Sequence, residues 1–421
     1  MKKRVLAGIF ALCMVLTACG KEPVGESTAG SQLEASSGKE PSGESPEGTQ
    51  FDASQVMPEY DAQNQYLTVT ACSFQEKDGV FLGTSFMDKY LHYYDEASGI
   101  SGVLCADPAC THDSIDCGAY VGAGATVSCY EGKLYWVAEE SYTAGDCYLW
   151  RGDLSGRNRE KVKPIGWEEI ILTYQPQQYV VHRGRLYILG RTQVVSGTEA
   201  GYRVTLLSTS LDGSEDFAVL YDKTFPKGGQ TSVLYVKNAA YLSFASLSED
   251  MTTDIIVERY DISGGTWETV YEEKGIEAYI GNIWVTEEET VYIPGSYENS
   301  AYVWKVENGQ RKQVLFRESD GASTPWITGD VVVCISQVDN IRWAEITTLS
   351  GQTLYKGKLF PEEIPGMEID PNQCGLALIG ADAEKLILNL TSMDSTDMGD
   401  YTIKLNIADS MKPTILWSSQ E

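Results

Sequence analysis

Histidine and the motifs of common catalytic sites are scarce in this sequence. Its 421 residues include only three histidines, at positions 92, 112 and 182. There is no phosphate-binding glycine loop of the Walker type and no G-x-S-x-G turn, and no serine–histidine–acid set is marked by local sequence. His92 and His182 fall within strand patterns, where we expect structural roles. These absences favour a binding protein over an enzyme that uses an activated nucleophile.

Positive charge is the second shortage. Lys and Arg together number 32 against 60 Asp and Glu, so the formal net charge is −28. Nucleic acids and anionic lipid headgroups bind basic surfaces, which makes both poor candidate partners. Cations, neutral sugars, peptides and basic proteins remain open.

The apolar stretch near the N-terminus, Val5–Leu16, is too short to cross a membrane core of about 30 Å as a helix. It follows three basic residues and precedes Leu16-Thr17-Ala18-Cys19, which is the layout of an export signal. Leu-Thr-Ala-Cys resembles a bacterial lipobox, which implies that Cys19 becomes a lipidated N-terminus carrying palmitate-type acyl chains. We therefore expect a lipoprotein signal peptide at 1–18 and anchoring to the outer, extracytoplasmic face of the cell membrane. The alternative is a cleaved secretory signal with a chance cysteine.

Large apolar residues are few in the segment after Cys19. Residues 20–55 are dense in Gly, Ser, Glu and Pro, with Val24, Leu33 and Phe51 as their large apolar residues. Such a composition buries too little surface to offset the entropy of ordering the chain. We expect a disordered tether over 19–57 and a folded region over 58–421.

An internal repeat runs through the folded region. A short apolar strand recurs at intervals of about 41 to 55 residues, in copies that begin at Gly79, Gly132, Gly184, Ala239, Glu289, Asp330 and Lys385. A second, alternating strand follows each copy and ends, in most copies, in a tight polar turn such as Ser98-Gly99 or Asp212-Gly213. Another apolar strand precedes each copy, and a fourth strand usually follows the turn.

Four antiparallel strands repeated seven times predict an all-β protein, a single β-propeller with seven four-stranded blades. Six or eight blades are alternatives, because the terminal copies match the repeat least well. A pair of β-sandwiches would not show seven matched strand pairs.

The loops between the second and third strands of the blades share one face of a propeller with the crossings from blade to blade. This face, here called the crossover face, usually carries the ligand site. It comprises the loops 139–146, 191–203, 246–254, 295–300, 337–340 and 391–400. The candidate ligand contacts in these loops are Tyr142, Tyr202, Glu249, Asp250, Asp254, Tyr297, Asp394, Asp397 and Asp400. Tyrosine rings can stack on sugars, and clustered carboxylates can bind calcium, although a solvated acidic loop is the better interpretation.

One group of chemistry-bearing residues stands apart from the repeat. Thirteen residues between the first two blades contain Cys105, Cys110, His112 and Cys117. Three thiolates and an imidazole are the ligand set of a closed tetrahedral zinc site, and four protein ligands leave no open position for water, so we expect a structural role. The spacing is not a common zinc-finger pattern, and extracytoplasmic cysteines also pair, so a disulfide or free thiols are alternatives. Cys129 and Cys147 form a further candidate pair.

The segment Leu104–Cys117, read as Leu-Cys-x-x-Pro-x-Cys-x-His, also carries a resemblance. Together with the lipobox and the tether, it is similar to uncharacterised lipoproteins of Gram-positive anaerobes that are generally assigned TolB-like propellers. The resemblance covers nearly the whole chain, although only the lipobox and Leu104–Cys117 are specific. It implies a propeller and surface anchoring, and the family brings no established activity.

The sequence thus predicts a membrane-anchored lipoprotein whose propeller recognises a protein or a glycan without catalysis. The first alternative is a carboxylate-dependent glycan lyase or hydrolase, because Asp and Glu are abundant. The second is an accessory subunit of an envelope complex, which the TolB-like resemblance suggests. No cofactor is expected besides a structural zinc ion.

Overall fold

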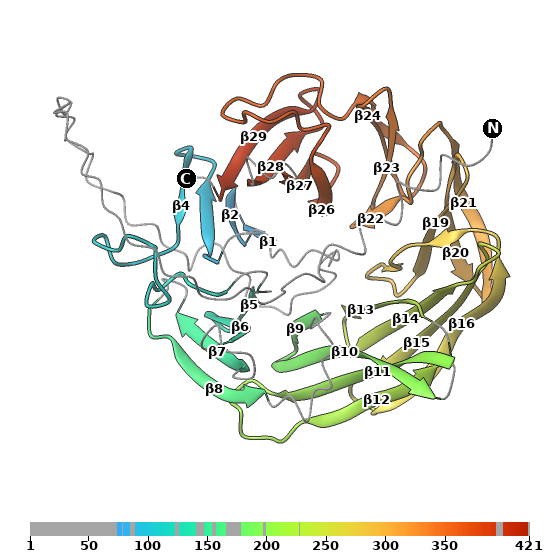
Figure 1. Cartoon of the computed structure of the whole chain (residues 1–421), viewed down its shortest axis with the longest axis horizontal. Helices are drawn as coiled ribbons and strands as arrows, with labels where there is room; N and C mark the ends of the chain where they lie inside the picture. The colour runs from blue at the N-terminus through green and yellow to red at the C-terminus, as the bar shows by residue number, and fades with distance from the viewer. Residues whose placement is uncertain are drawn as a thin grey trace, which may run out of the picture. The chain divides into compact units, whose positions relative to one another are not determined.

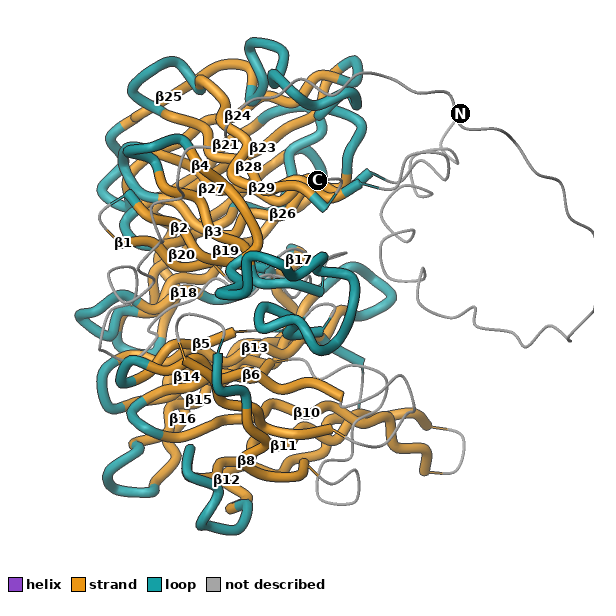
Figure 2. The backbone as a smooth tube through the Cα atoms, turned by 90° about the vertical axis from the view of Figure 1, so that its left-hand side faces the viewer, coloured by secondary structure: helices purple, strands orange, loops and turns teal. Residues whose placement is uncertain are grey.

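The computed structural model describes residues 74–77, 79–84, 89–122, 125, 127–139, 147–153, 157–165, 178–196, 199–226, 228–392 and 399–419. The chain divides into two compact units, 1–50 and 51–421, and every described residue belongs to the second. Within the described ranges the chain consists of strands and loops (Figure 2). These ranges contain no helix long and apolar enough to cross a membrane. The predicted signal peptide and tether lie outside the described residues.

The described strands form seven antiparallel sheets, each built from consecutive strands. The first four sheets are β1–β4 (Phe74–Lys77, Val80–Gly83, His92–Asp95, Ile100–Val103), β5–β8 (Val127–Tyr130, Lys133–Glu139, Cys147–Asp153, Glu160–Ile165), β9–β12 (Gln178–His182, Arg185–Ser196, Glu199–Ser210, Ala218–Phe225) and β13–β16 (Gln230–Val236, Ala239–Leu247, Thr253–Asp261, Thr266–Ile276). The other three are β17–β21 (Tyr279–Ile280, Trp284–Val285, Val291–Tyr297, Ser300–Glu307, Gln310–Glu318), β22–β25 (Trp326–Thr328, Val331–Val338, Ile341–Thr348, Thr353–Lys358) and β26–β29 (Gly375–Ala381, Lys385–Thr391, Asp400–Asn406, Lys412–Ser418).

The sheets are arranged as blades around a central axis, with the first strand of each blade innermost (Figure 1). This is a seven-bladed β-propeller, and it confirms the predicted fold class. All seven apolar repeat copies form second strands: β2, β6, β10, β14, β19, β23 and β27. In the fifth blade the innermost strand is interrupted, since β17 and β18 both pair with β19.

Burial explains why the second strands gave the strongest sequence signal. A second strand lies inside its sheet, and neighbouring blades cover both of its faces. In β14, eight consecutive residues from Ala239 are buried, so the strand is apolar almost without alternation. The outermost strand of the same blade, β16, is mostly exposed and polar. The turns between third and fourth strands use glycine where the backbone needs a positive φ, as at Gly99 (67°) and Gly213 (73°).

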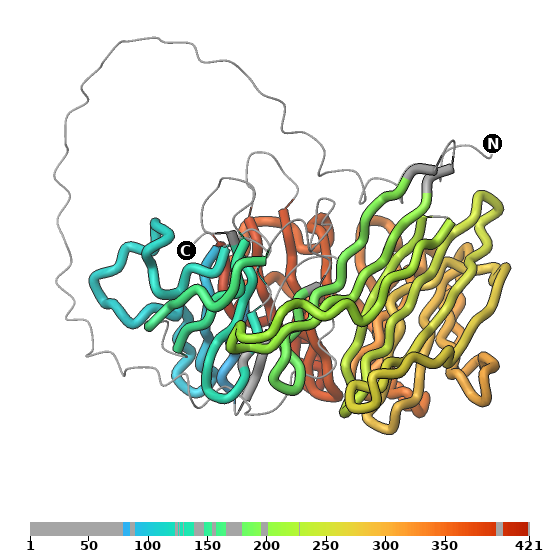
Figure 3. The backbone as a smooth tube through the Cα atoms, turned by 90° about the horizontal axis from the view of Figure 1, so that it is seen from below, coloured from blue at the N-terminus to red at the C-terminus, as the bar shows by residue number. Residues whose placement is uncertain are grey.

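The third blade differs from the prediction on the crossover face. Residues 191–203 are for the most part strand, because β10 runs to Ser196 and β11 begins at Glu199. The two strands form a regular hairpin that projects beyond the neighbouring blades (Figure 3). The ladder between β10 and β11 continues beyond the core of the blade, to the pair Ser196 and Glu199. The polar residues in this extension made the segment resemble a loop in the sequence.

Apolar side chains fill the junctions between adjacent blades. Among the described strands, no ladder joins the last blade to the first, because each of these two sheets contains only its own consecutive strands. The described contacts at this closure are made by side chains. Trp417 of β29 is 1% exposed and stacks on His92 of β3, with ring centroids 6.1 Å apart and an interplanar angle of 9°. Phe81 and Ile387 belong to the same apolar cluster.

Cationic side chains cross every junction between blades. Seven such contacts join Lys163 to the carbonyl of Glu215, Lys223 to Glu258, Arg259 to Glu289, Arg311 to Glu273, Arg317 to Glu345, Arg342 to the carbonyl of Cys374, and Lys404 to Glu96. The remaining junction, between the first and second blades, uses arginines that contact the cysteine–histidine segment. Several of the scarce basic residues of this acidic chain therefore lie where blades meet.

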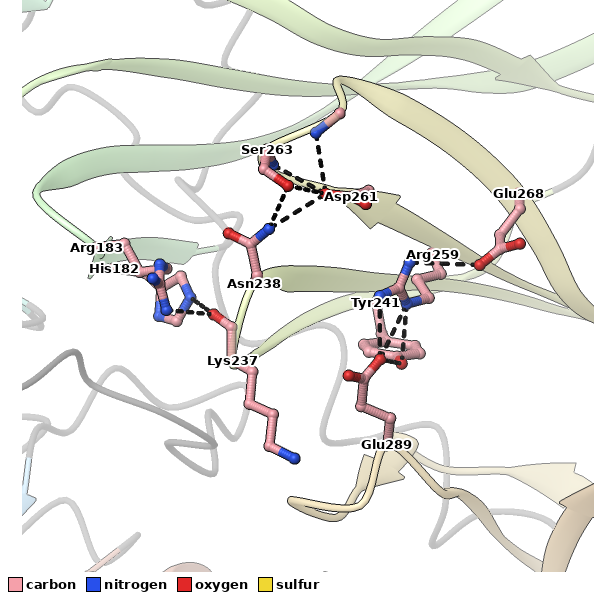
Figure 4. Close-up of polar contacts among 11 residues, drawn as sticks. His182, Arg183, Lys237, Asn238, Tyr241, Arg259, Asp261, Ser263, Glu268 and Glu289 are labelled. Atoms are coloured by element: carbon pink, nitrogen blue, oxygen red, sulfur yellow. Dashed lines mark hydrogen bonds and ion pairs between the residues drawn. The ribbon is translucent and has the colours of Figure 1, made fainter.

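Figure 4 shows two of these junctions on the face opposite the crossover face. The His182 side chain donates from Nε2 to the carbonyl of Lys237 at 2.8 Å, which joins the third blade to the fourth. Arg259 and the Tyr241 hydroxyl both contact the Glu289 carboxylate, at 3.1 and 2.8 Å, which joins the fourth blade to the fifth. Burial, assisted by the Glu289 carboxylate, raises the pKa of Tyr241 to about 12, so its hydroxyl stays a donor.

Candidate functional site

Residues 105–118, here called the Cys–His loop, begin and end beside the same backbone position. The amide of Leu104 donates to the carbonyl of Leu91 at 2.8 Å, and the amide of Leu91 donates to the carbonyl of Ala119 at 2.9 Å. A bridge between Tyr90 and Tyr120 continues this pairing. Because both ends are fixed next to β3, the residues between them leave the sheet as a closed loop.

Two turns place the sulfur atoms within the Cys–His loop. The Asp107 side chain accepts from the amide of Ala109 at 2.9 Å, and its carbonyl accepts from the amide of Cys110 at 3.1 Å. A second turn has the carbonyl of Ser114 accepting from the amide of Cys117 at 3.3 Å. Between the turns, His112 has a φ of 53°, a left-handed conformation in which histidine is enriched.

The four candidate metal ligands converge. One ligand atom from each of Cys105, Cys110, His112 and Cys117 lies within 4.8 Å of all the others, and the Nδ1 of His112 is 3.3 Å from the Sγ of Cys117. A zinc ion with Zn–S bonds of about 2.3 Å requires sulfurs about 3.8 Å apart. The spread of the four atoms fits one such ion at their centre. All three cysteines are free thiols in the structure.

The thiols differ in acidity because their surroundings differ. Burial acts to raise the pKa of Cys105, but backbone hydrogen bonds from Asp107 and Gly118 and contacts with the other sulfurs outweigh it, and the net shift is downward. Cys117 is 2% exposed, and its burial raises its pKa to about 12. Backbone amides that donate to sulfur are also a common means of stabilising a thiolate that binds a metal.

Two arginines at the start of β8 hold the Cys–His loop. Arg159 donates from one guanidinium nitrogen to the carbonyls of Ile115 and Cys117, both at 2.9 Å. Its guanidinium lies 5.2 Å from the centre of the Trp150 ring, and burial lowers its pKa without discharging it at neutral pH. Arg157 donates to the carbonyl of Ala106 at 3.2 Å. The first and second blades are thus joined through carbonyl groups of the loop.

A cavity of about 350 Å³ adjoins the loop. It is lined by Cys105, Ala106, Asp107, Pro108, Gly118 and Arg157. Small reagents can therefore reach the Cys105 side of the cluster.

The Cys–His loop connects two blades at the crossover face, as predicted, but its body lies on the outer side of the ring (Figure 1). It follows β4 and contacts the start of β8, which are both outermost strands. Cys129 and Cys147 are not partners. Cys129 pairs with Leu134, whereas Cys147 pairs with Glu139, so their Cα atoms are roughly 19 Å apart by strand geometry. A disulfide needs Cα atoms within about 7 Å.

Three of the acidic residues predicted on the crossover face make local hydrogen bonds. Asp250 accepts from the amide and hydroxyl of Thr252 at 3.2 and 2.7 Å, and Asp254 accepts from the amide of Gly275 at 2.9 Å. Asp400 is fully buried and accepts from the side chain of Asn389 at 2.5 Å, so it is not a surface contact for a ligand. Glu249 is exposed in the β14–β15 connection.

The predicted aromatic residues have different surroundings. Tyr297 is 40% exposed at the end of β19. Tyr202 is half-buried in β11, with the Arg191 guanidinium 4.7 Å from its ring centre. The other predictions, Cys19, Tyr142, Asp394 and Asp397, lie outside the described residues.

The structure adds a polar cluster that the sequence did not predict, here called the inner-strand cluster: Gln230, Tyr279 and Asn282. The Tyr279 hydroxyl donates to the Gln230 side chain at 2.9 Å, and that side chain donates to Asn282 at 2.5 Å. Gln230 starts β13 and Tyr279 starts β17, so both lie at the crossover-face ends of innermost strands. Tyr279 is 43% exposed. The Gly281-Asn282 pair, which interrupts the inner strand, was the available sequence signal.

All three histidines of the chain are engaged in packing or in the Cys–His loop. His92 stacks on Trp417, His182 hydrogen bonds the carbonyl of Lys237, and His112 belongs to the Cys–His loop. His92 and His182 are also buried, at 5% and 0% exposure. Neither of these two imidazoles is placed to take a proton from a ligand on the surface.

Comparison with known proteins identifies the fold only. No protein-family model matches the sequence, and no curated protein matches it. Similar solved structures include a puromycin-hydrolysing peptidase of Mycobacterium tuberculosis (13% identity, TM-score 0.51, covering 86% of this chain and 56% of that one). Prolyl oligopeptidase B of Galerina marginata is similar at 11% identity and a TM-score of 0.51, over 87% of this chain and 51% of that one. The chain spans about half the length of these proteins, and at such identities the likeness shows the β-propeller alone.

Proposed function

We propose that this protein is a lipid-anchored, extracytoplasmic lipoprotein whose propeller recognises a neutral polar ligand without catalysis. The inner-strand cluster is the observation that carries the recognition proposal. Gln and Asn side chains both donate and accept hydrogen bonds, and an exposed tyrosine adds an apolar ring with a polar tip. These groups suit the hydroxyl and amide groups of a glycan or a peptide.

The charge of the chain and the positions of its histidines support the same proposal. A net charge of −28 disfavours anionic ligands. Two of the three histidines are buried structural residues, so acid–base catalysis by histidine at the inner-strand cluster has no support. The peptidase activity of the similar structures is not extended to this chain, because the likeness shows the fold alone.

The anchoring part of the proposal rests on the lipobox at Cys19. We expect a Cys19→Ser variant produced in a bacterial host to lose incorporation of labelled palmitate and to keep its signal peptide uncleaved, because the thiol is the acceptor of the diacylglycerol. A Cys13→Ser variant, which changes a cysteine inside the apolar run, is the control and should label normally. Equal labelling of both variants would refute lipidation at Cys19.

The recognition part predicts that Tyr279→Ala weakens ligand binding by about 30-fold, the effect of losing roughly 2 kcal/mol at a recognition hot spot. The measurement is binding of the full-length chain to neutral glycan and peptide arrays, followed by titration of each hit. Phe316→Ala is the control, because Phe316 is also an exposed aromatic residue (42%) but lies on the outermost strand β21 rather than on an innermost strand.

The same assay separates the competing functions. Retention of an unchanged ligand supports recognition, whereas release of cleaved glycan would indicate a carboxylate-dependent lyase or hydrolase. Capture of a membrane protein by the same face, with no array binding, would indicate an accessory subunit. If Phe316→Ala and Tyr279→Ala weaken binding equally, the inner-strand cluster is not the site.

A further inference from the structure

We propose that Cys105, Cys110, His112 and Cys117 bind one zinc ion, and that this ion holds the first two blades together. The proposal concerns the outer side of the ring and is independent of the inner-strand cluster. Its first support is the ligand set. Three sulfurs and one imidazole nitrogen lie within 4.8 Å of one another, in a loop whose two ends are fixed beside the same backbone position. Zinc in closed protein sites takes four such ligands in a tetrahedron.

The environment of the four side chains also fits a structural metal. Cys117 is buried in the apolar cluster between the first two blades, together with Leu104, Ala119 and Val121. The other three side chains are half-buried. The Tyr90 ring lies 6.5 Å from the His112 ring at an angle of 61°, which orients the imidazole. A site with four protein ligands has no open position, so zinc at this point contributes to stability rather than to catalysis.

The junctions between blades differ in which groups their basic side chains contact. At four of the other six junctions, a lysine or arginine contacts a carboxylate of the adjacent blade. At the other two, Lys163 and Arg342 contact backbone carbonyls. At the first junction, Arg159 and Arg157 also donate to carbonyls, those of Ala106, Ile115 and Cys117. A carbonyl in a loop is a fixed partner only while the loop is ordered. The 14-residue Cys–His loop contains turns but no strand, so a cross-link among its ligands fixes the carbonyls that receive the arginines.

Metal binding and the stability of the blade junction are therefore linked. Zinc binds the ordered loop, and the ordered loop binds Arg159. A ligand that binds only the folded form stabilises that form in proportion to the logarithm of its concentration over its Kd. Removal of the ion should loosen the loop, expose the sulfurs and lower the unfolding temperature of the protein.

The first test measures metal content and thiol reactivity of the full-length chain purified with zinc and without chelator. We expect one zinc ion per chain in addition to any non-specific metal removed by a weak chelator. Alkylation followed by peptide mapping should leave Cys105, Cys110 and Cys117 unmodified until a strong chelator removes the ion. Cys105 should then react first, because it borders the 350 Å³ cavity. Absence of zinc together with a disulfide between two of these residues would overturn the proposal.

The second test uses variants that keep the local backbone. His112→Asn removes a ligand while retaining a residue that tolerates a positive φ. We expect its zinc affinity to fall by more than the roughly 10–100-fold typical of losing a partner outside the ligand set. Cys334→Ser, in β23 of the sixth blade, is the control and should keep one zinc ion. Full zinc occupancy in His112→Asn would show that the histidine is not a ligand and would overturn the four-ligand site.

The third test addresses the blade junction itself. Arg159→Met should lower zinc affinity by about 10–100-fold, because the carbonyl beside Cys117 loses its buried donor. Chelation should lower the unfolding temperature of the wild type and leave that of His112→Asn unchanged. If chelation removes zinc without changing the unfolding temperature of the wild type, the ion does not hold the blades and that part of the proposal is wrong.

Discussion

Trp417→Ala is expected to lower the free energy of unfolding by about 3–5 kcal/mol, the usual cost of truncating a buried tryptophan. The side chain is 1% exposed and stacks on His92 at the closure between the last blade and the first. The described strands of these two blades share no ladder, so truncation leaves a cavity between two sheets. Denaturant unfolding monitored by circular dichroism measures the change.

Trp343→Ala is the control for this experiment. Trp343 is also on a strand, β24, but it is 42% exposed, so its truncation leaves little cavity. We expect a loss of less than about 1 kcal/mol. If Trp417→Ala costs no more than Trp343→Ala, packing at the closure does not limit the stability of the ring.

Arg342→Met should destabilise the protein by about 3 kcal/mol. The guanidinium donates to the carbonyl of Pro371 at 2.8 Å and to the carbonyl of Cys374 at 2.5 Å, and thereby holds the long connection between β25 and β26. Burial lowers the pKa of this arginine, but the side chain stays charged at neutral pH. Methionine retains much of the apolar stem and leaves two carbonyls without their cationic donor, each contact being worth about 1.5–3 kcal/mol.

The matched control is Arg203→Met in β11. Arg203 also makes two hydrogen bonds, to the Asp222 carboxylate at 2.7 and 2.6 Å, but both side chains are more than a third exposed. Exposed ion pairs contribute about 0–1 kcal/mol, so we expect a correspondingly small loss. Equal losses in the two variants, measured by denaturant unfolding, would show that burial does not determine the strength of these contacts.

The sequence predicted the blades well because each second strand is buried on both faces. Copies such as Ala239–Leu247 are therefore nearly continuous apolar runs, because few of their positions are exposed to solvent. The four candidate ligands of the Cys–His loop could be grouped from the sequence because all four lie in one short segment. Their convergence within 4.8 Å is consistent with the spacing but could not be derived from it.

The sequence failed where contacts join distant segments. Nothing local indicates that Arg159 contacts carbonyls 42 and 44 residues away, or that Gln230 meets Asn282 across two blades. The sequence pattern grouped Asp400 with Asp394 and Asp397 in one loop, yet Asp400 opens β28 and is buried against Asn389. Such contacts depend on how the blades pack, which a local pattern does not encode.

Because each blade is built from consecutive strands, such a chain can evolve by gaining or losing whole blades. Every sheet comes from one continuous stretch, so an in-frame duplication of about 40 to 55 codons would add a complete blade and split none. The added blade would need only side chains on its two faces that pack against the neighbouring blades. Because the described strands of the first and last blades share no ladder, the ring can gain or lose a blade without rebuilding a composite sheet, and binding surfaces can diversify blade by blade.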